Sequence, residues 1–198
     1  MPGLFTPKKS TMEFKQQQLF ENIPFEDYLK MPGYSYSYLK GSKNLPDSPT
    51  ENMLLGTAVH NYLLEPHKFD HTSANAKAIA MALKPMIAPV LPHAKSELSV
   101  TGLMLYEGFS MPYKGRVDIA IPGKLVIDIK VTTIDIRKAI DFFGYHHQVS
   151  GYAYAIGATK AFIVAINSRT KKTQVVAIHI TPDFWQKKII QNGFPVTF

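Results

Sequence analysis

Two strand-like runs separated by Pro122 and Gly123 are the feature that most constrains what this chain can fold into. The first run covers residues 114–121 and the second covers residues 125–130. Both are rich in β-branched and aliphatic residues, which favour strands, whereas proline followed by glycine favours a turn between them. The sequence therefore predicts two neighbouring strands of one sheet in the middle of the chain.

Each of these runs carries an acidic residue, Asp118 in the first and Asp128 in the second, and Lys130 follows two positions later. Alternate side chains of a strand point to one face, so Asp128 and Lys130 should project together, with Ile127 and Ile129 on the other side. Two crowded carboxylates repel each other, and burial strengthens the repulsion. A hard divalent cation such as Mg²⁺, which takes oxygen ligands, would make the arrangement favourable. The pattern indicates metal-assisted phosphodiester cleavage.

The composition limits the class of protein. The chain has 198 residues, of which 45% are hydrophobic, enough for one compact domain with its own core. We expect residues 1–22 to form a flexible segment and residues 23–198 a single domain. No secretory leader and no apolar run near the ~18 residues of a membrane span is visible, which predicts a cytoplasmic protein without membrane association. The absence of cysteine excludes disulfides, thiolate zinc sites and cysteine-ligated iron–sulfur clusters. The net charge of +7 is compatible with a polyanionic partner but is a weak signal alone.

Periodicity along the chain predicts the order of the elements. Helical patterns are followed by three strands, a helix, two strands and a last helix, which indicates an α/β fold with a mixed central sheet flanked by helices. The expected helices cover residues 51–64, 75–86, 136–156 and 182–191, and the expected strands cover residues 96–105, 108–121, 125–131, 161–167 and 173–180.

Four further polar residues lie at places where they could join a site. His60 lies on a largely apolar helix, Glu97 lies at the start of a strand, and Gln148 and Tyr152 are four residues apart, on one face of a helix. Each has an ordinary explanation: a core histidine, a surface carboxylate and a plain helix face. Their occurrence in one order with Asp118, Asp128 and Lys130 favours a shared site.

The ordered set resembles the PD-(D/E)XK nuclease superfamily and, within it, the RecE-like and RecB-like phage exonucleases. The resemblance covers roughly residues 25–165, and any one motif is weak while the ordered set is strong. It implies a restriction-endonuclease-like fold. The matching segments are residues 28–37, the helix at residues 56–66, the Gly-Arg-Val-Asp run at residues 115–118, the Asp-Ile-Lys-Val-Thr-Thr run at residues 128–133, and Gln148 with Tyr152.

The resemblance implies a role for each matched position. Asp118, Asp128 and the backbone carbonyl of Ile129 would ligate Mg²⁺, for which Mn²⁺ could substitute, and His60 would be a further ligand or would lie just outside the ligands. Lys130 would position the attacking water and stabilise developing charge. Gln148 and Tyr152 would contact DNA phosphate or orient the site, and Glu97 would be the acidic residue ahead of the Gly-Arg-Val-Asp strand. Expected DNA contacts outside these are Arg116, Lys171 and Lys172, although a charged turn at Lys171 and Lys172 is equally well explained by solvation.

The implied activity is a magnesium-dependent deoxyribonuclease that digests linear duplex DNA from its ends, in the 5′-to-3′ direction, in phage-type recombination or repair. A single-strand annealing protein, a homo-oligomer and the cytoplasm of a bacterial host are the implied partners and setting. Many relatives carry a four-cysteine iron–sulfur cluster, which this chain cannot, and no phosphate loop of a motor is present. Two alternatives stay open: an endonuclease of restriction or junction-resolving type, and a non-catalytic DNA-binding module on the same fold.

Overall fold

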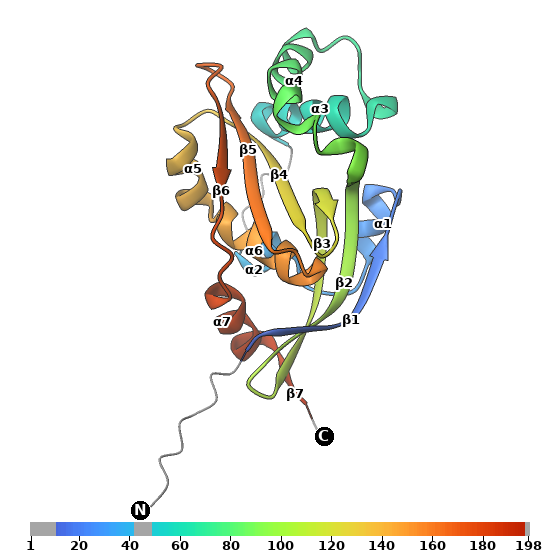
Figure 1. Ribbon diagram of the computed structural model, residues 1–198, viewed down its shortest axis with the longest axis vertical. Coiled ribbons are helices and arrows are strands. Elements are labelled where there is room, and N and C mark those ends of the chain that lie inside the picture. The colour runs from blue at the N-terminus through green and yellow to red at the C-terminus, as the bar shows by residue number, and fades with distance from the viewer. Residues whose placement is uncertain (1–10, 42–48, 197–198) are drawn as a thin grey trace, which may run out of the picture.

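A seven-stranded sheet with helices on both sides forms the centre of the molecule, in a computed structural model that describes residues 11–41 and 49–196 (Figure 1). Six strands follow one another in the order β1-β2-β3-β4-β5-β6, and β7 pairs with β3. The mixed sheet flanked by helices confirms the predicted fold class. The strands are β1 (Glu13–Phe20), β2 (Lys95–Tyr106), β3 (Phe109–Ile121), β4 (Leu125–Thr132), β5 (Lys160–Asn167), β6 (Thr173–Ala177) and β7 (Phe194–Pro195).

The helices lie close to the predicted ranges. They are α1 (Phe25–Lys30), α2 (Tyr36–Leu39), α3 (Glu51–Leu64), α4 (Ala74–Ile87), α5 (Ile136–Phe143), α6 (Tyr145–Ile156) and α7 (Asp183–Asn192), with single 3₁₀ turns at Pro66–Lys68 and Leu91–His93. Within the described part of the chain, no helix combines the length and the apolar character needed to cross a membrane.

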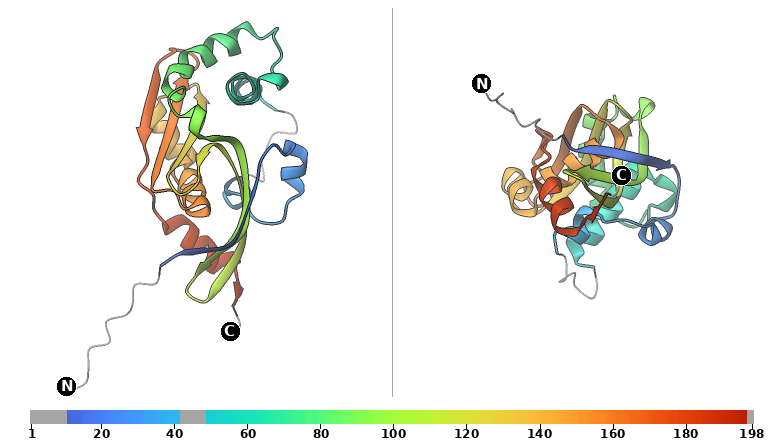
Figure 2. Two further views of the ribbon diagram at one scale, coloured as in Figure 1. Left: turned by 45° about the vertical axis from the view of Figure 1, so that its right-hand side comes forward. Right: turned by 90° about the horizontal axis from the view of Figure 1, so that it is seen from below.

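The sheet is mixed because one connection differs from the others. All paired strands are antiparallel except β4 and β5, which are parallel. Because parallel neighbours need a crossover connection, the chain returns through α5 and α6 between these two strands. β2 and β3 form one long curved hairpin that extends beyond β4 and β5 (Figure 2). This hairpin and β4 carry the acidic residues singled out in the sequence.

Two hydrophobic cores cover the two faces of the sheet. One packs α2, α5, α6 and α7 against the sheet and contains the buried Trp185 and Tyr113. The other packs α3 and α4 against β4 and β5 and contains Ile127 and Ile129. The two isoleucines point toward α3 and α4, on the side of β4 opposite Asp128 and Lys130. The alternation predicted for these four residues is therefore found, whereas the helices that cover the isoleucines could not be named from it.

The expected single helix at residues 136–156 is two helices, separated at Gly144. Gly144 has φ 65° and ψ 32°, a left-handed conformation that ends α5 and that glycine adopts at little cost. A Cβ atom at this position would also overlap the hydroxyl of Tyr36. The break turns the chain so that α6 starts at Tyr145.

The predicted flexible segment at residues 1–22 differs from the structure over its second half. Glu13–Phe20 forms the edge strand β1, paired antiparallel with β2, with an irregularity between Lys15 and Gln18. Residues 1–10 lie outside the described residues.

Candidate active site

Three carboxylates lie at one level across the neighbouring strands β2, β3 and β4. The β2–β3 pairing places Ser96 opposite Ile119 and Leu98 opposite Val117, so Glu97 and Asp118 are the residues between these pairs. The β3–β4 pairing includes Ile119 opposite Ile127, and the next position along both strands joins Asp118 and Asp128. The sheet register thus accounts for how residues far apart in sequence supply one acidic cluster.

Glu97 leaves the regular strand geometry at this level. Its φ is 51°, in the left-handed region that a non-glycine residue rarely adopts and that costs on the order of 1 kcal/mol or more. Such outliers persist where the surrounding contacts compensate for them, and they cluster at functional sites. Here the compensation comes from the partners of the Glu97 carboxylate, which are Arg116 and His60.

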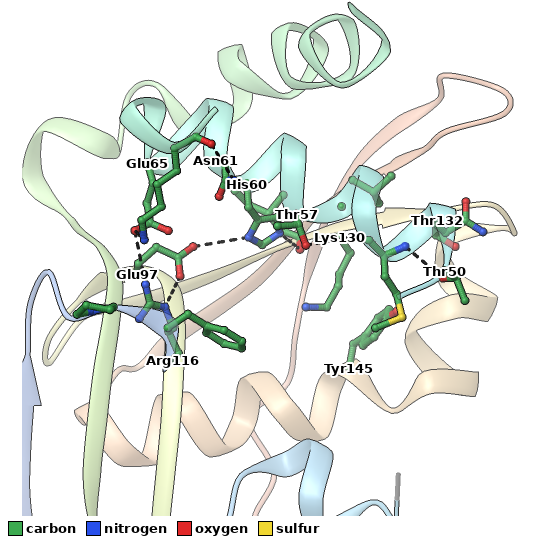
Figure 3. Close-up of a pocket in the computed structure, with 18 of the residues that line it drawn as sticks. Thr50, Thr57, His60, Asn61, Glu65, Glu97, Arg116, Lys130, Thr132 and Tyr145 are labelled. Carbon is green, nitrogen blue, oxygen red and sulfur yellow. Dashed lines mark hydrogen bonds and ion pairs between the residues drawn. The ribbon is translucent and has the colours of Figure 1, made fainter. Parts of the chain in front are cut away.

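His60 closes the cluster from helix α3, which lies over this end of the strands (Figure 3). Its Nδ1 atom lies 3.7 Å from Glu97 Oε1, and its Nε2 atom lies 3.7 Å from Asp118 Oδ2. Nε2 also lies 3.0 Å from the carbonyl oxygen of Ile129. One ligand atom from each of His60, Glu97 and Asp118 falls within 4.8 Å of the others, close enough to share one ion.

Asp118 is held by the backbone of the next strand. The N–H of Ile129 donates a hydrogen bond of 2.6 Å to Asp118 Oδ2, and this bond is buried. The carbonyl of the same residue faces His60, so Ile129 orients one predicted ligand through its N–H and contacts another through its oxygen. Ile129 thus lies where the sequence prediction needs it, with its carbonyl in the cluster.

Asp128 and Lys130 form a buried ion pair beside this cluster, with Lys130 Nζ 2.7 Å from Asp128 Oδ2. The Asp128 side chain is only 1% exposed. Within the described part of the chain, neither carboxylate oxygen of Asp128 accepts a hydrogen bond of regular geometry. Buried carboxylate oxygens nearly always have a hydrogen-bond or ionic partner. The oxygens of Asp128 could therefore bind a cation in addition to Lys130.

The local charges shift several pKa values. Burial and the Asp128 carboxylate raise the pKa of Asp118 to about 7, although His60 and Lys130 oppose them. Burial alone would lower the pKa of His60, but the carboxylates of Asp118 and Glu97 outweigh it and raise that pKa to about 9. Burial is likewise outweighed at Lys130, whose pKa rises above its usual value because of Asp128 and Asp118.

In the absence of a metal ion, an imidazolium at His60 therefore neutralises part of the negative charge of the cluster. The pKa of Glu97 also depends on burial and on the neighbouring charges, with the opposite outcome. Burial would raise its pKa, but the hydrogen bonds and charges of His60 and Arg116 lower it.

Arg116, an expected DNA contact, has its partners within the protein. Its side chain is 8% exposed, and its Nε atom donates a bond of 2.7 Å to Glu97 Oε2. It also donates to the carbonyl of Ile23 at 3.0 Å and lies 3.6 Å from Glu65 Oε1. With these partners the guanidinium of Arg116 holds the carboxylate of Glu97 from the side opposite His60.

Gln148 and Tyr152 form a pair on α6, as their spacing predicted. Gln148 Nε2 lies 2.7 Å from the Tyr152 hydroxyl, and the Tyr152 ring is buried against β3. A Cβ on Gly115 would lie 3.0 Å from that ring and 2.5 Å from the hydroxyl of Tyr113, so glycine in the Gly-Arg-Val-Asp run makes room for Tyr152. Burial raises the pKa of Tyr152, and the nearby carboxylates of Asp128 and Asp118 raise it further.

Lys171 and Lys172 lie apart from this cluster, in the exposed turn between β5 and β6. Lys171 Nζ is 3.1 Å from Asn75 Oδ1 at the start of α4. The turn adjoins the end of β4, because the N–H of Ser168 donates to the carbonyl of Thr132. The two lysines are therefore outside the pocket but near its rim.

A pocket of about 1050 Å³ opens over the cluster. His60, Glu97, Ile129 and Lys130 line it, whereas Asp118 and Asp128 are not among its lining residues. The sequence analysis missed three other groups of lining residues, which are Glu65 at the end of α3, Phe25 after β1, and the aromatic residues Phe143 and Tyr145 at the α5–α6 junction. Glu65 lies within the matched segment at residues 56–66 but had no expected role there, and Phe25, Phe143 and Tyr145 belong to none of the matched segments.

The residues of the cluster fit a divalent cation. They offer an imidazole nitrogen, several carboxylate oxygens and the Ile129 carbonyl, and Asp128 has buried oxygens without regular hydrogen bonds. Carboxylates and carbonyls suit Mg²⁺ and Mn²⁺, whereas an imidazole suits the transition metals. The mixed set therefore favours an ion of this class without distinguishing its identity.

No protein-family model and no curated protein matches this chain. Among solved structures, it is similar to a candidate exonuclease from Eubacterium rectale, with 19% identity, a TM-score of 0.49, and coverage of 83% of this chain and 71% of that one. It is also similar to the protein SSO0001, with 17% identity, a TM-score of 0.44, and coverage of 86% of this chain and 84% of that one. Because both TM-scores are below 0.5, the function has to be argued from the site itself.

Proposed function

We propose that this chain is a metal-dependent deoxyribonuclease that hydrolyses linear duplex DNA from its ends. The observation that carries the proposal is the alignment of three carboxylates, Glu97, Asp118 and Asp128, at one level of the sheet. His60 and Lys130 lie beside them and line one pocket together with Glu97. A catalytic role explains this costly crowding of buried charge better than a structural role does. Within it, His60, Glu97, Asp118 and the Ile129 carbonyl would hold the ion, and Asp128 would complete the set.

A bound divalent ion such as Mg²⁺, or Mn²⁺ in its place, would neutralise the phosphate and stabilise the negative charge that develops on it. The protein supplies the rest. Lys130, whose raised pKa keeps it charged at neutral pH, cannot serve as a base in this state. Its ammonium instead donates hydrogen bonds to the attacking water or to a phosphate oxygen, while Asp128 holds it at 2.7 Å.

Other residues would bind and orient the DNA. We assign Gln148 to a phosphate contact or to orientation of the site, with its amide held by Tyr152. Lys171 and Lys172 at the rim would meet the backbone of the duplex, a contact that weakens with salt. Arg116 is assigned to Glu97 and not to DNA.

We further propose 5′-to-3′ digestion in phage-type recombination or repair, by a single domain over residues 23–198, in the cytoplasm of a bacterial host. An annealing protein that takes over the 3′ strand and a homo-oligomer around the DNA belong to the same proposal. These finer points rest on the motif order described above.

The test compares linear duplex DNA labelled at either 5′ or 3′ end with a covalently closed circle, each with Mg²⁺, Mn²⁺ or EDTA. Asp128→Asn should lower the rate of DNA cleavage at least a hundredfold, because it replaces a carboxylate of the cluster by a neutral amide of nearly the same shape. Asp141→Asn, on the exposed side of α5, is the matched control and should retain the wild-type rate.

Digestion of the linear DNA alone, dependent on metal and on Asp128, supports the exonuclease, and the label released first gives the direction. Cleavage of the circle would replace it with an endonuclease. DNA binding without any cleavage would replace it with a binding module.

A further inference from the structure

We infer that Tyr145 is a positioning residue of the same site, whose ring face holds the ammonium of Lys130, an inference that rests on the proposed nuclease function. Lys130 Nζ lies over the Tyr145 ring, 5.0 Å from its centroid. This is within the distance at which a cation is attracted to an aromatic face. Lys130 comes from β4 and Tyr145 from the first turn of α6, and both reach into the pocket (Figure 3).

The long side chain of Lys130 is not oriented by a single contact. A lysine side chain has four flexible carbons, and one ion pair fixes the distance of its head but not its direction. Asp128 lies two residues before Lys130 on the same strand and holds it at 2.7 Å from one side. The Tyr145 ring limits its movement from a different element, so the two contacts together fix where the ammonium points.

Tyr145 itself is held rigidly at the α5–α6 junction. Its ring stacks on Phe143, with centroids 5.4 Å apart and planes 26° apart. The carbonyl of Phe143 accepts hydrogen bonds from the Tyr36 hydroxyl at 2.9 Å and from Lys40 Nζ at 2.7 Å. Between the two aromatic residues, the left-handed Gly144 sets the direction in which α6 begins. A ring fixed at this many points is suited to orienting a flexible partner.

The ammonium of Lys130 lies over the ring of Tyr145, so variants that keep or remove the ring separate its role from that of the hydroxyl. Tyr145→Phe retains the aromatic face, whereas Tyr145→Leu and Tyr145→Met fill similar space without one. Tyr154→Leu, on the same helix but outside the pocket, is the matched control for loss of a tyrosine from α6. All variants are compared as full chains with Mg²⁺ on linear duplex DNA, with kcat and KM determined separately.

The leucine and methionine variants should lose about tenfold to thirtyfold in kcat with little change in KM, which corresponds to a cation–π contact of about 1.4 to 2 kcal/mol. Tyr145→Phe should restore kcat to within about threefold of the wild type, and Tyr154→Leu should leave kcat unchanged. Equal losses in the phenylalanine and leucine variants would assign the effect to the hydroxyl and overturn the inference. So would wild-type kcat in both non-aromatic variants.

A second readout does not require activity. The neutral amine of Lys130, formed when the ammonium leaves its contacts and loses its proton, attacks the N-hydroxysuccinimide ester of acetic acid and releases N-hydroxysuccinimide. The rate of this acetylation, followed by mass spectrometry at fixed pH in EDTA, therefore reports how firmly the ammonium is held. We expect acetylation several-fold faster in Tyr145→Leu and Tyr145→Met than in Tyr145→Phe and the wild type. If the wild type cuts no DNA, the proposed function fails while this measurement still decides the contact; if acetylation is equal in all variants, the contact itself is rejected.

Discussion

The Nε2 atom of His60 lies 3.0 Å from the carbonyl oxygen of Ile129. A carbonyl oxygen can only accept a hydrogen bond, so Nε2 carries a hydrogen in this arrangement. A histidine can bind a metal only through a nitrogen that has lost its proton. The same two groups are the expected ligands of one ion, so binding of the ion must replace a proton that now lies between them.

The first prediction is that metal binding releases protons in a pH-dependent way. The pKa of His60 is raised to about 9, because Asp118 and Glu97 outweigh the effect of burial. At pH 8 each Mn²⁺ bound should therefore displace close to one proton, and the affinity should rise with pH until about 9. Titration calorimetry in buffers of different ionisation enthalpy measures the number released. His60→Gln should abolish the release, and a binding enthalpy independent of the buffer in the wild type would contradict the linkage.

The second prediction concerns the stability of the metal-free protein. A histidine whose pKa is raised on folding stabilises the folded state fully below its unfolded pKa, near 6.5, and this contribution disappears as the pH rises through about 9. The difference in unfolding free energy between the wild type and His60→Gln should thus be largest near pH 6 and smallest above pH 9. Urea unfolding in EDTA at several pH values provides the measurement. A difference that grows toward pH 9 would show that His60 is neutral in the fold.

Much of the centre of the fold could be predicted because its signals are local. The alternating runs around Asp118 and Asp128 and the helical periodicity before Pro66 gave β3, β4 and α3 to within one or two residues. The β1 strand could not be predicted, because Gln16, Gln17 and Gln18 follow no alternation and the strand lies at the exposed edge of the sheet. An edge strand buries too little for its sequence to show a pattern.

In the site, too, local relationships could be predicted from the sequence and long-range contacts could not. Alternate residues of one strand, such as Asp128 and Lys130 in β4, could be paired from their spacing alone. The contacts of Arg116 could not be predicted, because its partners Glu97 and Ile23 are 19 and 93 residues away and only the folded chain brings them together. Tyr145 was missed for a related reason: its direction depends on the conformation of Gly144, which the helical pattern of residues 136–156 conceals.

The third prediction is that Asp118→Asn stabilises the metal-free protein while abolishing metal binding. Burial and Asp128 raise the pKa of Asp118 to about 7, so at pH 8 this carboxyl is mostly ionised and its ionisation costs more free energy in the folded protein than in the unfolded chain. Asparagine removes the charge and can still accept the hydrogen bond from the N–H of Ile129. We expect the free energy of unfolding in EDTA at pH 8 to rise by about 1–2 kcal/mol.

Thermal unfolding of the same variant with Mn²⁺ provides the comparison. The wild type should gain stability on addition of the ion, whereas Asp118→Asn should gain little, because a ligand stabilises only the state that binds it. A variant less stable than the wild type in EDTA would show that the carboxylate of Asp118 is structural.

The fourth prediction separates the positioning role of Arg116 from that of a DNA contact. Lysine retains the positive charge but has no planar fork, so Arg116→Lys cannot reach Glu97, Glu65 and the Ile23 carbonyl together. Leaving Glu97 without its bond of 2.7 Å should lower metal affinity by about tenfold to a hundredfold and cost about 2 kcal/mol in stability. Affinity for DNA in EDTA, measured by fluorescence anisotropy, should change little, and the dependence of that affinity on salt should stay the same.

A matched control is the double variant Lys171→Gln, Lys172→Gln at the exposed turn. It should leave metal affinity unchanged and reduce the salt dependence of DNA binding by about two charges, since each phosphate contact contributes roughly one unit to the slope. If Arg116→Lys instead reduced the salt slope and spared metal affinity, Arg116 would meet the DNA backbone after all. The opposite responses of the two variants would place Arg116 with the metal ligands and the turn with the DNA.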